Sequence, residues 1–428
     1  MAAQVRRTGN LSAFLNRRVL LGALLCVLAL TFALALDSSL AGCAAADGEG
    51  ETSHVSTTAD NAADQTPEAD PDAAGVPEDA NAADQAAATS ARQAVTPSQA
   101  GALQVIGSQL CDAKGNPVQL RGVSTHGLAW FPQYVNAEFF NELRQTWGAN
   151  VVRLALYTAE SGGYTTDGDQ DALYQLVCEG IDDATAADLY VIADWHVLSD
   201  QNPLAHVDEA AAFFGDLSAR YADANNVIYE ICNEPNGATT WDNIVEYANQ
   251  IIPVIRANDS DAIIIVGTPE WSQRVDAAAA APLADDNVLY ALHFYAATHG
   301  QDLRDRMKAA VDAGLPVFVS EFGICDASGN GAIDYASADA WVKLMDELNV
   351  SYVCWNVSNK DEASALFVPQ CAKTSGFDEA DLSEEGQWLM AVLRGEQPGG
   401  DDVTSVDTSP GTSANTSADP ADPAAIDA

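Results

Sequence analysis

Two glutamates in this 428-residue chain each follow an apolar, strand-like run. Glu234 follows the run 226–232 in the string Asn-Glu-Pro, and Glu321 follows the run 316–320 in Ser-Glu-Phe-Gly. Two carboxyl groups ~5 Å apart can break a glycosidic bond with retention of configuration, one as a protonated acid and the other as an ionised nucleophile. A single strand-end glutamate could be a solvated loop residue, but the two strings together favour a catalytic acid and nucleophile pair.

Neighbouring polar residues would give the two carboxyl groups different protonation states. Arg153 lies inside an apolar run, where a buried charge needs an acidic partner. We expect Arg153 to keep the Glu321 carboxylate ionised, with Tyr295 as a hydrogen-bond donor to it. The negative Glu321 would in turn raise the pKa of Glu234. Asn233 is a candidate ligand of the sugar 2-hydroxyl, a contact that strengthens in the oxocarbenium-like transition state.

Aromatic and imidazole side chains gather at the ends of the same apolar runs. Trp130 and Trp355 offer flat apolar faces suited to the C–H surface of a pyranose ring. Three of the run ends carry a histidine, and another ends in a tyrosine: His126, His196, His293 and Tyr157. This clustering indicates that the side chains share one site, built where the runs end.

Eight short apolar runs, rich in β-branched residues, provide the strands that would position these side chains. The runs are 118–124, 150–157, 189–194, 226–232, 262–268, 288–294, 316–320 and 352–357. Segments with helical periodicity are 137–147, 171–187, 208–224, 241–257, 303–313, 337–348 and 383–393, while 269–286 is less regular. Apolar strands joined by helices imply a parallel sheet, and eight units in about 290 residues suit an α/β fold of the (β/α)8 TIM-barrel type. Its active site would lie at the C-terminal ends of the strands.

Two features bear on the choice of this fold. Before the first strand, residues 103–110 and the turn-forming string 114–117 predict a hairpin that could close the bottom of the barrel. The alternative fold is an open doubly wound sheet. Such a sheet usually carries a glycine-rich phosphate loop after a strand, and the chain has no such loop. The closed barrel is therefore the expected architecture.

The chain is strongly acidic, and its amino-acid composition changes along its length. Its 62 Asp and Glu against 19 Lys and Arg leave a net charge of -43, which excludes nucleic acid as a partner because phosphate would be repelled. Residues 43–100 and 397–428 consist of small, polar and acidic residues with few large apolar side chains, which predicts a disordered acidic tether and a disordered acidic tail. We therefore expect one catalytic domain at 101–396.

Residues 1–42 resemble an export signal. Four arginines precede an apolar run from Val19 to Leu36, and the string Leu40-Ala41-Gly42-Cys43 resembles a bacterial lipobox. In that motif the cysteine is lipidated, so Cys43 would anchor the chain on the extracellular face of the cytoplasmic membrane. An uncleaved membrane anchor and ordinary secretion remain the alternatives. We expect the protein to be a monomer.

Six cysteines fall in the globular segment. They are Cys111, Cys178, Cys232, Cys325, Cys354 and Cys371, and their 15 possible pairings are all left open. No Cys-x-x-Cys string is present, and no histidine stands at ligand distance from a cysteine pair, so a zinc site is not expected. Cys232 and Cys354 lie in apolar strand-like runs, where a buried free thiol is the favoured interpretation.

The segment from about Leu103 to Arg394 resembles glycoside hydrolase family 5, and within it the bacterial endoglucanase subfamily 2. Four strings carry the resemblance: Gly122-Val123-Ser124-Thr125-His126-Gly127, Tyr157 with Gly162-Gly163-Tyr164, Asp194-Trp195-His196-Val197-Leu198-Ser199-Asp200, and Trp355-Asn356-Val357-Ser358-Asn359-Lys360. The family's signature positions are filled by Arg153, His196, Asn233, Glu234, His293, Tyr295, Glu321 and Trp355. The resemblance implies a (β/α)8 barrel that cleaves β-1,4-glucans with retention and uses no metal or other cofactor.

The same resemblance implies individual roles. Glu234 would be the acid/base and Glu321 the nucleophile. Residues implied to contact glucosyl units on the non-reducing side of the cut are His126, Trp130, Tyr157, Trp355, Lys360 and Glu362. Asn359 stands where relatives commonly carry aspartate, which puts the affinity of the outer glucosyl subsite in question. Nearby Asp361 is a possible substitute.

The expected function is that of a retaining endo-β-1,4-glucanase, a cellulase acting on soluble or amorphous β-glucan. A β-mannanase or a mixed-linkage β-glucanase would use the same mechanism, because family resemblance defines mechanism better than sugar identity. A catalytically silent surface glucan-binding protein is the alternative from another class. It would need the tryptophan faces but not both carboxylates.

Overall fold

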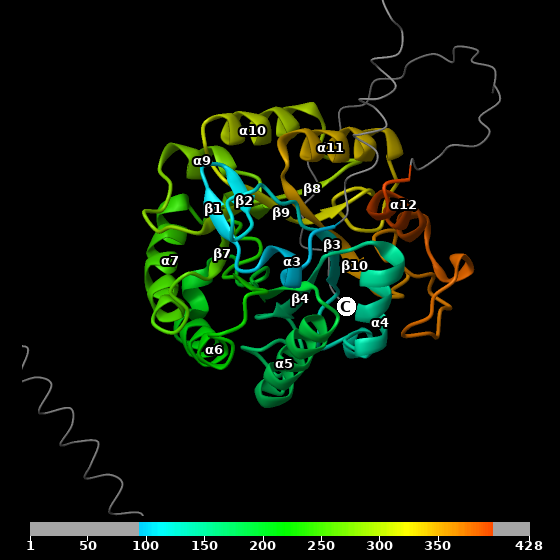
Figure 1. Ribbon diagram of the computed structural model, residues 1–428, viewed down its shortest axis with the longest axis horizontal. Helices are drawn as coiled ribbons and strands as arrows, with labels where there is room; N and C mark the ends of the chain where they lie inside the picture. The colour runs from blue at the N-terminus through cyan, green and yellow to red at the C-terminus, as the bar shows by residue number, and fades with distance from the viewer. Residues whose placement is uncertain (1–93, 397–428) are drawn as a thin grey trace, which may run out of the picture. The chain divides into compact units, whose positions relative to one another are not determined.

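The computed structural model describes residues 94–396 (Figure 1). Eight parallel strands close into a barrel in the order β10-β3-β4-β5-β6-β7-β8-β9. They are β3 (Arg121–Thr125), β4 (Val151–Tyr157), β5 (Tyr190–His196), β6 (Val227–Glu230), β7 (Ile263–Val266), β8 (Val288–Tyr295), β9 (Val317–Gly323) and β10 (Ser351–Val357). Each apolar run of the sequence contains one of these strands, which confirms the (β/α)8 barrel.

Helices surround the barrel, and at least one follows every barrel strand (Figure 1). The α-helices are α3 (Pro97–Ala100), α4 (Ala137–Glu142), α5 (Gln170–Ala186), α6 (Val207–Arg220), α7 (Trp241–Arg256), α8 (Pro269–Ser272), α9 (Val275–Ala280), α10 (Gln301–Asp312), α11 (Tyr335–Leu348) and α12 (Glu384–Arg394). A π-helix (Leu143–Trp147) continues α4, and short 3-10 turns are Pro132–Tyr134, Pro203–His206 and Glu379–Asp381. The segment 269–286, irregular in the sequence, holds the two short helices α8 and α9.

Two separate cores stabilise the fold. The larger core lies between the outer faces of the strands and the surrounding helices. A parallel barrel strand is buried on both faces, so its outward-pointing side chains also lie in a core. The smaller core fills the lower barrel interior with branched residues such as Val151, Ile192 and Ile265. The antiparallel hairpin β1 (Gln104–Ile106) and β2 (Gln109–Cys111) adds Leu110 to this inner core. The hairpin therefore closes the bottom of the barrel.

Strand boundaries differ from the sequence-based ones where function concentrates. Four predicted runs end too early, because β3 continues to Thr125, β5 to His196, β8 to Tyr295 and β9 past Glu321 to Gly323. In contrast, β6 ends at Glu230, and Glu234 lies in the loop beyond it. Polar residues inside a strand conceal its end from a hydrophobicity pattern, although the ladder hydrogen bonds continue.

The six cysteines of the described part are all buried, and none is disulfide-bonded there. The prediction for Cys232 and Cys354 is confirmed. No helix within residues 94–396 is long and apolar enough to cross a membrane. The export signal, Cys43, the acidic tether and the C-terminal tail all lie outside the described residues.

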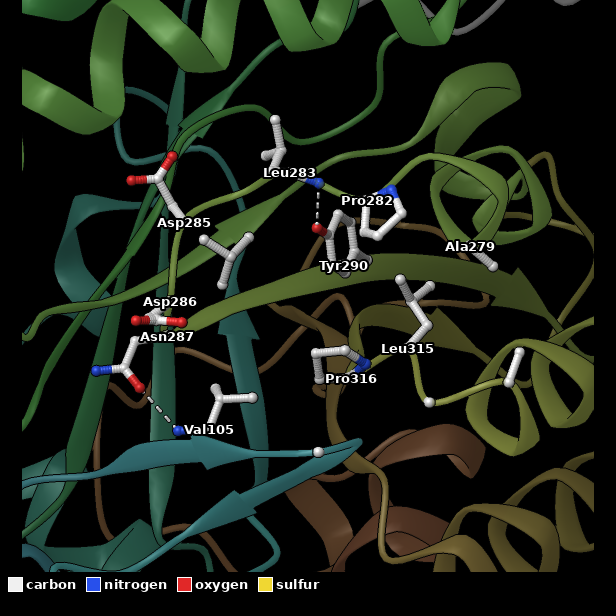
Figure 2. A pocket seen from close by; sticks show the side chains of 14 residues that line it. Val105, Ala279, Pro282, Leu283, Asp285, Asp286, Asn287, Tyr290, Leu315 and Pro316 are labelled. Carbon is white, nitrogen blue, oxygen red and sulfur yellow. Dashed lines mark hydrogen bonds between the residues drawn. The ribbon is translucent and has the colours of Figure 1, made fainter. Parts of the chain in front are cut away.

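A shallow hollow of about 270 Å³ lies on the N-terminal face of the barrel (Figure 2). The hairpin, the loop before β8 and the loop before β9 line it. Two hydrogen bonds join its walls, one from the Val105 amide to Asn287 and one from the Leu283 amide to the Tyr290 hydroxyl. All of the glutamates and histidines considered above lie elsewhere, so this hollow is not the predicted site.

Candidate active site

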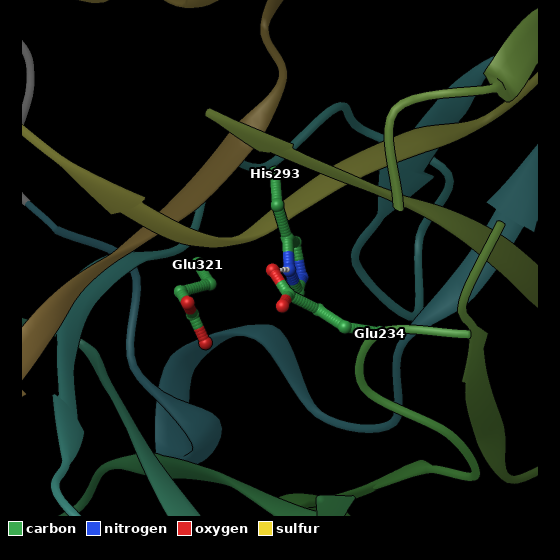
Figure 3. A group of neighbouring side chains, drawn as sticks. All are labelled: Glu234, His293 and Glu321. Carbon is green, nitrogen blue, oxygen red and sulfur yellow. Dashed lines mark hydrogen bonds and ion pairs between the residues drawn. The ribbon is translucent and has the colours of Figure 1, made fainter. Parts of the chain in front are cut away.

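Glu234 and Glu321 meet at the C-terminal end of the barrel (Figure 3). Glu321 is held on β9, while Glu234 lies on the loop after β6. That loop is fastened to β5, because the amides of Asn233 and Glu234 donate to the carbonyls of Trp195 and Val197 at 3.2 and 3.0 Å. Oxygen atoms of the two carboxyl groups lie within 4.8 Å of each other, and both residues are buried.

Arg153 is the central cation of the site and is completely buried on β4. Its guanidinium contacts three carboxylates rather than one. The distances are 3.3 Å to Glu321, 2.7 Å to Glu230 and 3.0 Å to Asp194. A further bond of 2.6 Å runs to the Asn233 side-chain oxygen. A single positive charge thus balances several buried acids, and the cluster would be strongly negative if every acid were ionised.

His293 and Tyr295, both on β8, each contact one of the two glutamates. His293 Nδ1 lies 2.9 Å from Glu234 Oε1, and Figure 3 shows these two side chains pointing toward each other. The Tyr295 hydroxyl donates to Glu321 Oε1 at 2.9 Å. Residues 293 and 295 are two apart on one strand, so both side chains point into the barrel. β8 therefore gives each of the two carboxyl groups a hydrogen-bond partner of its own.

His196 and Asn233 form the side of the site next to β5. His196 Nδ1 lies 2.6 Å from the Asp194 carboxylate, and its Nε2 lies 3.2 Å from Asn233 Nδ2. Because an amide nitrogen can only donate, His196 Nε2 is the acceptor and Nδ1 carries the proton. The remaining Asn233 amide hydrogen is directed at the Val197 carbonyl at 3.3 Å. A bond from Asn233 to a sugar hydroxyl would have to replace one of these two long bonds.

Burial raises the pKa of both catalytic candidates, and that of Glu234 rises further. The pKa of Glu234 is raised to about 8. The pKa of Glu321 is raised to about 7 by burial and by Glu234, against the lowering effects of His293, Arg153 and Tyr295. Because the pKa of Glu234 is the higher of the two, Glu234 can stay protonated beside an ionised Glu321.

Arg153 lowers the pKa of Glu321, in the predicted direction, but burial outweighs this effect, and Arg153 also pairs with Asp194 and Glu230. The predicted main cause of the raised pKa of Glu234 was wrong. Burial, rather than the neighbouring Glu321, is the main cause of the raised pKa of Glu234. The asymmetry between the two acids therefore comes from their different partners within one desolvated cavity.

An aromatic wall adjoins the two carboxylates. Trp355 stacks on His196 with ring centroids 5.2 Å apart, and Tyr157 lies against the same imidazole at 4.0 Å. His126 packs against Trp355 at 5.2 Å and against Trp130 at 5.5 Å. Trp130 is 40% exposed, whereas Trp355 is only 6% exposed. The wall therefore runs from the buried carboxylates out to the surface, as a bound chain of sugars requires.

Polar residues of the loop after β10 stand beside this wall. Lys360 pairs with Glu362 at 3.0 Å, and Glu362 lies 3.8 Å from His126. Burial holds the pKa of His126 down at about 3, so the imidazole is neutral and its link to Glu362 is not an ion pair. The side chains implied to contact glucosyl units thus lie together on one flank of the site.

Asn359, the departure from the resembled family, has a structural role. Its amide donates to the Cys371 carbonyl at 2.9 Å and approaches the Pro369 carbonyl at 3.5 Å. An aspartate here could not donate to either carbonyl when ionised. Asn359 therefore fastens the segment 369–371 to the loop that carries Lys360.

One group of potential metal ligands exists among the described residues. Glu234, His293 and Glu321 offer ligand atoms within 4.8 Å of one another. The closest pair of these atoms is already joined by the bond from Glu234 to His293 Nδ1. A protonated Glu234 is a hydrogen-bond donor rather than a metal ligand, and proton positioning accounts for the arrangement.

Some residues of the site went unassigned in the sequence analysis. Asp194 and Glu230 both contact Arg153, Ser320 bridges Glu230 and His293, and Ser272 donates to the Asn233 carbonyl at 2.7 Å. A signal was available for Glu230, because an acidic residue inside the apolar run 226–232 needs a buried cation. No comparable signal marks Ser320 or Ser272, since serine is common at strand ends and in turns.

A (β/α)8 barrel with two adjoining carboxyl groups at the C-terminal ends of its strands, beside an aromatic wall, defines a glycoside hydrolase. The cellulase family model, glycosyl hydrolase family 5, matches residues 111–361. The chain belongs to this family. The resemblance drawn from its strand-end strings is confirmed.

Individual relatives agree with this assignment. The chain is 48% identical over 293 residues to endoglucanase A of Butyrivibrio fibrisolvens, covering 68% of each chain. It is 44% identical over 319 residues to an endoglucanase of Clostridium saccharobutylicum, covering 74% of this chain and 69% of the relative. The catalytic domain of Thermobifida fusca endoglucanase Cel5A, solved in complex with cellotetraose, superposes with a TM-score of 0.67 at 39% identity and covers 70% of this chain and all of that one.

Proposed function

We propose that the chain is a retaining endo-β-1,4-glucanase that hydrolyses internal bonds of soluble or amorphous β-glucan. One observation carries the proposal: two buried carboxyl groups lie within 4.8 Å of each other beside an aromatic wall. This spacing suits a direct displacement by a carboxylate, whereas an inverting enzyme leaves room for a water with carboxyls ~6.5–9.5 Å apart. The endoglucanase relatives support β-1,4-glucan as the substrate class.

The reaction proceeds by double displacement. The Glu321 carboxylate attacks the anomeric carbon, the glycosidic C–O bond breaks, and Glu234 gives its proton to the leaving oxygen. A covalent glycosyl ester of Glu321 results. Water then attacks the same carbon, Glu234 takes up a proton from that water, and the ester bond breaks to restore both carboxyl groups.

The supporting residues act through these two carboxyls. Arg153 and Tyr295 stabilise the charge that Glu321 carries before attack and after the ester is cleaved. His293 holds Glu234 in line with the cavity, and His196 with Asn233 shapes the floor on which the reacting sugar rests. The aromatic residues Trp130, Tyr157 and Trp355, with His126, Lys360 and Glu362, bind the glucosyl units on the non-reducing side.

Proton NMR of cellopentaose hydrolysis tests this assignment directly. We expect the β-anomer of the new reducing end to appear first and the α-anomer to follow by mutarotation. An initial α-anomer would refute the retaining mechanism. Release of reducing sugar from carboxymethylcellulose, lichenan and glucomannan separates the alternatives, because activity confined to glucomannan indicates a mannanase. Tight binding of cellotetraose without any product would indicate a glucan-binding protein.

The location of the enzyme is also a proposal. The lipobox string ending at Cys43 supports a lipid-anchored monomer on the extracellular face of the cytoplasmic membrane, with residues 43–100 as a tether. In a bacterial host, the full chain should partition with membranes, and Cys43→Ala should release it or leave the precursor unprocessed. Unchanged release of the wild type into the medium would favour ordinary secretion. Sedimentation of the detergent-extracted protein tests the monomeric state.

A further inference from the structure

A continuous chain of hydrogen bonds links the two catalytic glutamates through the barrel interior. From Glu234 it passes to His293 Nδ1 at 2.9 Å, and from His293 Nε2 to the Ser320 hydroxyl at 2.9 Å. Ser320 Oγ lies 2.6 Å from Glu230 Oε1, and the other Glu230 oxygen receives Arg153 Nε at 2.7 Å. Arg153 then reaches Glu321. Ser320 and Glu230 are completely buried and contribute nothing to the reaction described above.

The protonation state of Glu230 sets the direction of every bond in this chain. Burial raises the pKa of Glu230, whereas the Arg153 guanidinium, which donates to Oε2 at 2.7 Å, lowers that pKa and favours the carboxylate. A carboxylate can only accept, so the single Ser320 hydrogen is given to Glu230. Ser320 Oγ must then accept from His293 Nε2, which therefore carries the imidazole hydrogen. His293 Nδ1 is left as a bare acceptor facing Glu234.

We propose that Ser320 and Glu230 are positioning residues that hold His293 in its Nε2–H tautomer, so that Nδ1 accepts a hydrogen bond from a protonated Glu234. The proposal rests on the assignment of Glu234 as the acid/base. In this tautomer the neutral Glu234 makes a hydrogen bond, whereas its carboxylate would face a nitrogen lone pair. The contact therefore favours the protonated acid before the first step. After that step it makes the Glu234 carboxylate a stronger base toward the incoming water.

The surroundings of the pair agree with a neutral imidazole. Burial lowers the pKa of His293 to about 4, so a second proton on the ring is not expected near neutral pH. Titratable and charged groups that surround Glu234 and His293 come from five strands of the barrel. They are Arg153 and Tyr157 on β4, Asp194 and His196 on β5, Glu230 on β6, Tyr295 on β8 and Glu321 on β9. Among residues 94–396, only Glu234 and Ser320 contact the His293 ring nitrogens at hydrogen-bond distance.

The nitrogen signals of His293 test the tautomer in the resting protein, without substrate. In protein carrying ¹⁵N-labelled histidine, we expect long-range proton–nitrogen correlations to show a protonated Nε2 and an unprotonated Nδ1 near neutral pH. The His293 signals are identified by their loss in His293→Gln. A protonated Nδ1 in the wild type overturns the proposal. This readout does not depend on turnover, so it stays separate from a failure of the glucanase assignment.

Two variants should change the tautomer in different ways. Ser320→Ala removes the acceptor for Nε2, so both tautomers become populated and the upper limb of the kcat/KM pH profile moves down by roughly 0.5 to 1 unit. Ser320→Thr, which keeps the hydroxyl, should restore the limb. In Glu230→Gln, the side-chain amide can donate to Ser320 Oγ. The Ser320 hydroxyl then donates to His293 Nε2, so the imidazole hydrogen of His293 must lie on Nδ1. Because Glu230→Gln also removes a negative charge, both limbs of its kcat/KM pH profile should move. The ¹⁵N signals of His293 are therefore the decisive measurement for this variant.

Ser124→Ala is the matched control. Ser124 is also a buried serine on a barrel strand, and its hydroxyl lies 3.3 Å from Arg153, but His293 is not among its partners. The variant should leave the His293 signals and the upper limb in place. The proposal fails if folded Ser320→Ala shows the wild-type upper limb and wild-type nitrogen signals. If Ser320→Ala does not fold, the wild-type and Glu230→Gln spectra decide the question.

Discussion

At the scale of single residues, two chemically identical side chains, Glu234 and Glu321, have different roles because they have different hydrogen-bond partners. Glu321 receives donors from Arg153 and Tyr295, which favour a carboxylate. Among the described side chains, Glu234 has only the His293 nitrogen at hydrogen-bond distance. Both groups are desolvated, so the number and direction of hydrogen bonds, rather than exposure, decide which one keeps a proton.

Removing the nucleophile should separate catalysis from binding. Glu321→Gln keeps the size of the side chain but cannot form the glycosyl ester, so turnover should fall by ~10⁴-fold or more. Binding of cellotetraose, measured by calorimetry, should remain largely intact because the aromatic wall is unchanged. Glu246→Gln makes the same chemical change on the exposed face of α7 and should leave both quantities as they are. Turnover by Glu321→Gln at near wild-type rate would contradict the nucleophile assignment.

The pH dependence of kcat/KM should be bell-shaped around neutrality. Activity rises as Glu321 ionises through a pKa of about 7, and it falls as Glu234 loses its proton through a pKa of about 8. The two limbs belong to the coupled pair rather than to either residue alone. Initial rates on a neutral cello-oligosaccharide between pH 5 and 10 measure them. A profile without a maximum in that range would contradict the two-carboxylate mechanism.

Glu234→Gln provides the control for the upper limb. An aryl cellobioside with a good leaving group needs no acid assistance in the first step, so kcat/KM of the variant should lose the upper limb. The lower limb should persist and move to lower pH, because Glu234 contributes to the raised pKa of Glu321. A retained upper limb would assign that limb to another group.

At the scale of elements, most barrel strands place a functional side chain in or near the site, and the helices outside brace the strands. One brace is a buried acid on α12. Glu385 accepts the Ile324 amide, just beyond β9, at 3.0 Å and lies 3.3 Å from the Cys354 thiol on β10. Its other oxygen has no hydrogen-bond partner within the described part of the chain. Burial raises the pKa of Glu385 to about 8, so this carboxyl is neutral in the folded protein near pH 7.

Glu385 should therefore make the fold less stable as pH rises. Its folded pKa lies above the unfolded value, so the folded state holds a proton that the unfolded state has released. Its contribution to the free energy of unfolding falls by about 1.4 kcal/mol per pH unit from the unfolded pKa up to about 8. Glu385→Gln keeps an acceptor for Ile324 and cannot ionise. Urea unfolding at pH 5, 6, 7 and 8 should give a flatter dependence for the variant than for the wild type.

Parallel curves for Glu385→Gln and the wild type would contradict a buried, protonated Glu385. Glu384→Gln is the neighbouring control on the same turn of α12. Its side chain is exposed and bonds to the Tyr335 hydroxyl at 3.0 Å. The control should follow the wild-type pH dependence.

At the scale of the whole molecule, the chain carries a net charge of -43, whereas its β-glucan substrate is uncharged. The acidic surface therefore neither attracts nor repels β-glucan, although it repels an anionic derivative. Salt screens such repulsion with a Debye length of about 10 Å at 0.1 M. The charge thus affects solubility more than substrate choice.

Ionic strength should separate two substrates that share the same backbone. For neutral cellopentaose, kcat/KM should stay nearly constant from low to high salt. For carboxymethylcellulose, which is anionic, kcat/KM should rise with salt as repulsion is screened. Equal salt dependence for both substrates would show that the effect acts on the enzyme itself. Circular dichroism across the same salt range checks that the fold is unchanged.

Much of the fold and part of the site follow from the amino-acid sequence. The eight apolar runs each contain a barrel strand, because a strand buried on both faces must be almost wholly apolar. Glu234, Glu321 and Arg153 could be singled out because charged groups next to such runs need a reason to be there. Strand ends were less predictable, since the polar residues that extend β8 and β9 interrupt the hydrophobic pattern, although the two strands stay paired beyond a register shift as far as Tyr295 and Gly323.

The sequence by itself determined the barrel, the family and the identity of the paired carboxyls, because these follow from local patterns and strand-end strings. Tertiary structure alone decided how the charges are shared. Arg153 serves Asp194 and Glu230 as well as Glu321, and Ser320 directs the hydrogen of His293. These residues lie far apart in the chain, and a hydrogen bond depends on distances of tenths of an ångström and on which atom donates. Such relations arise only when the strands close into a barrel.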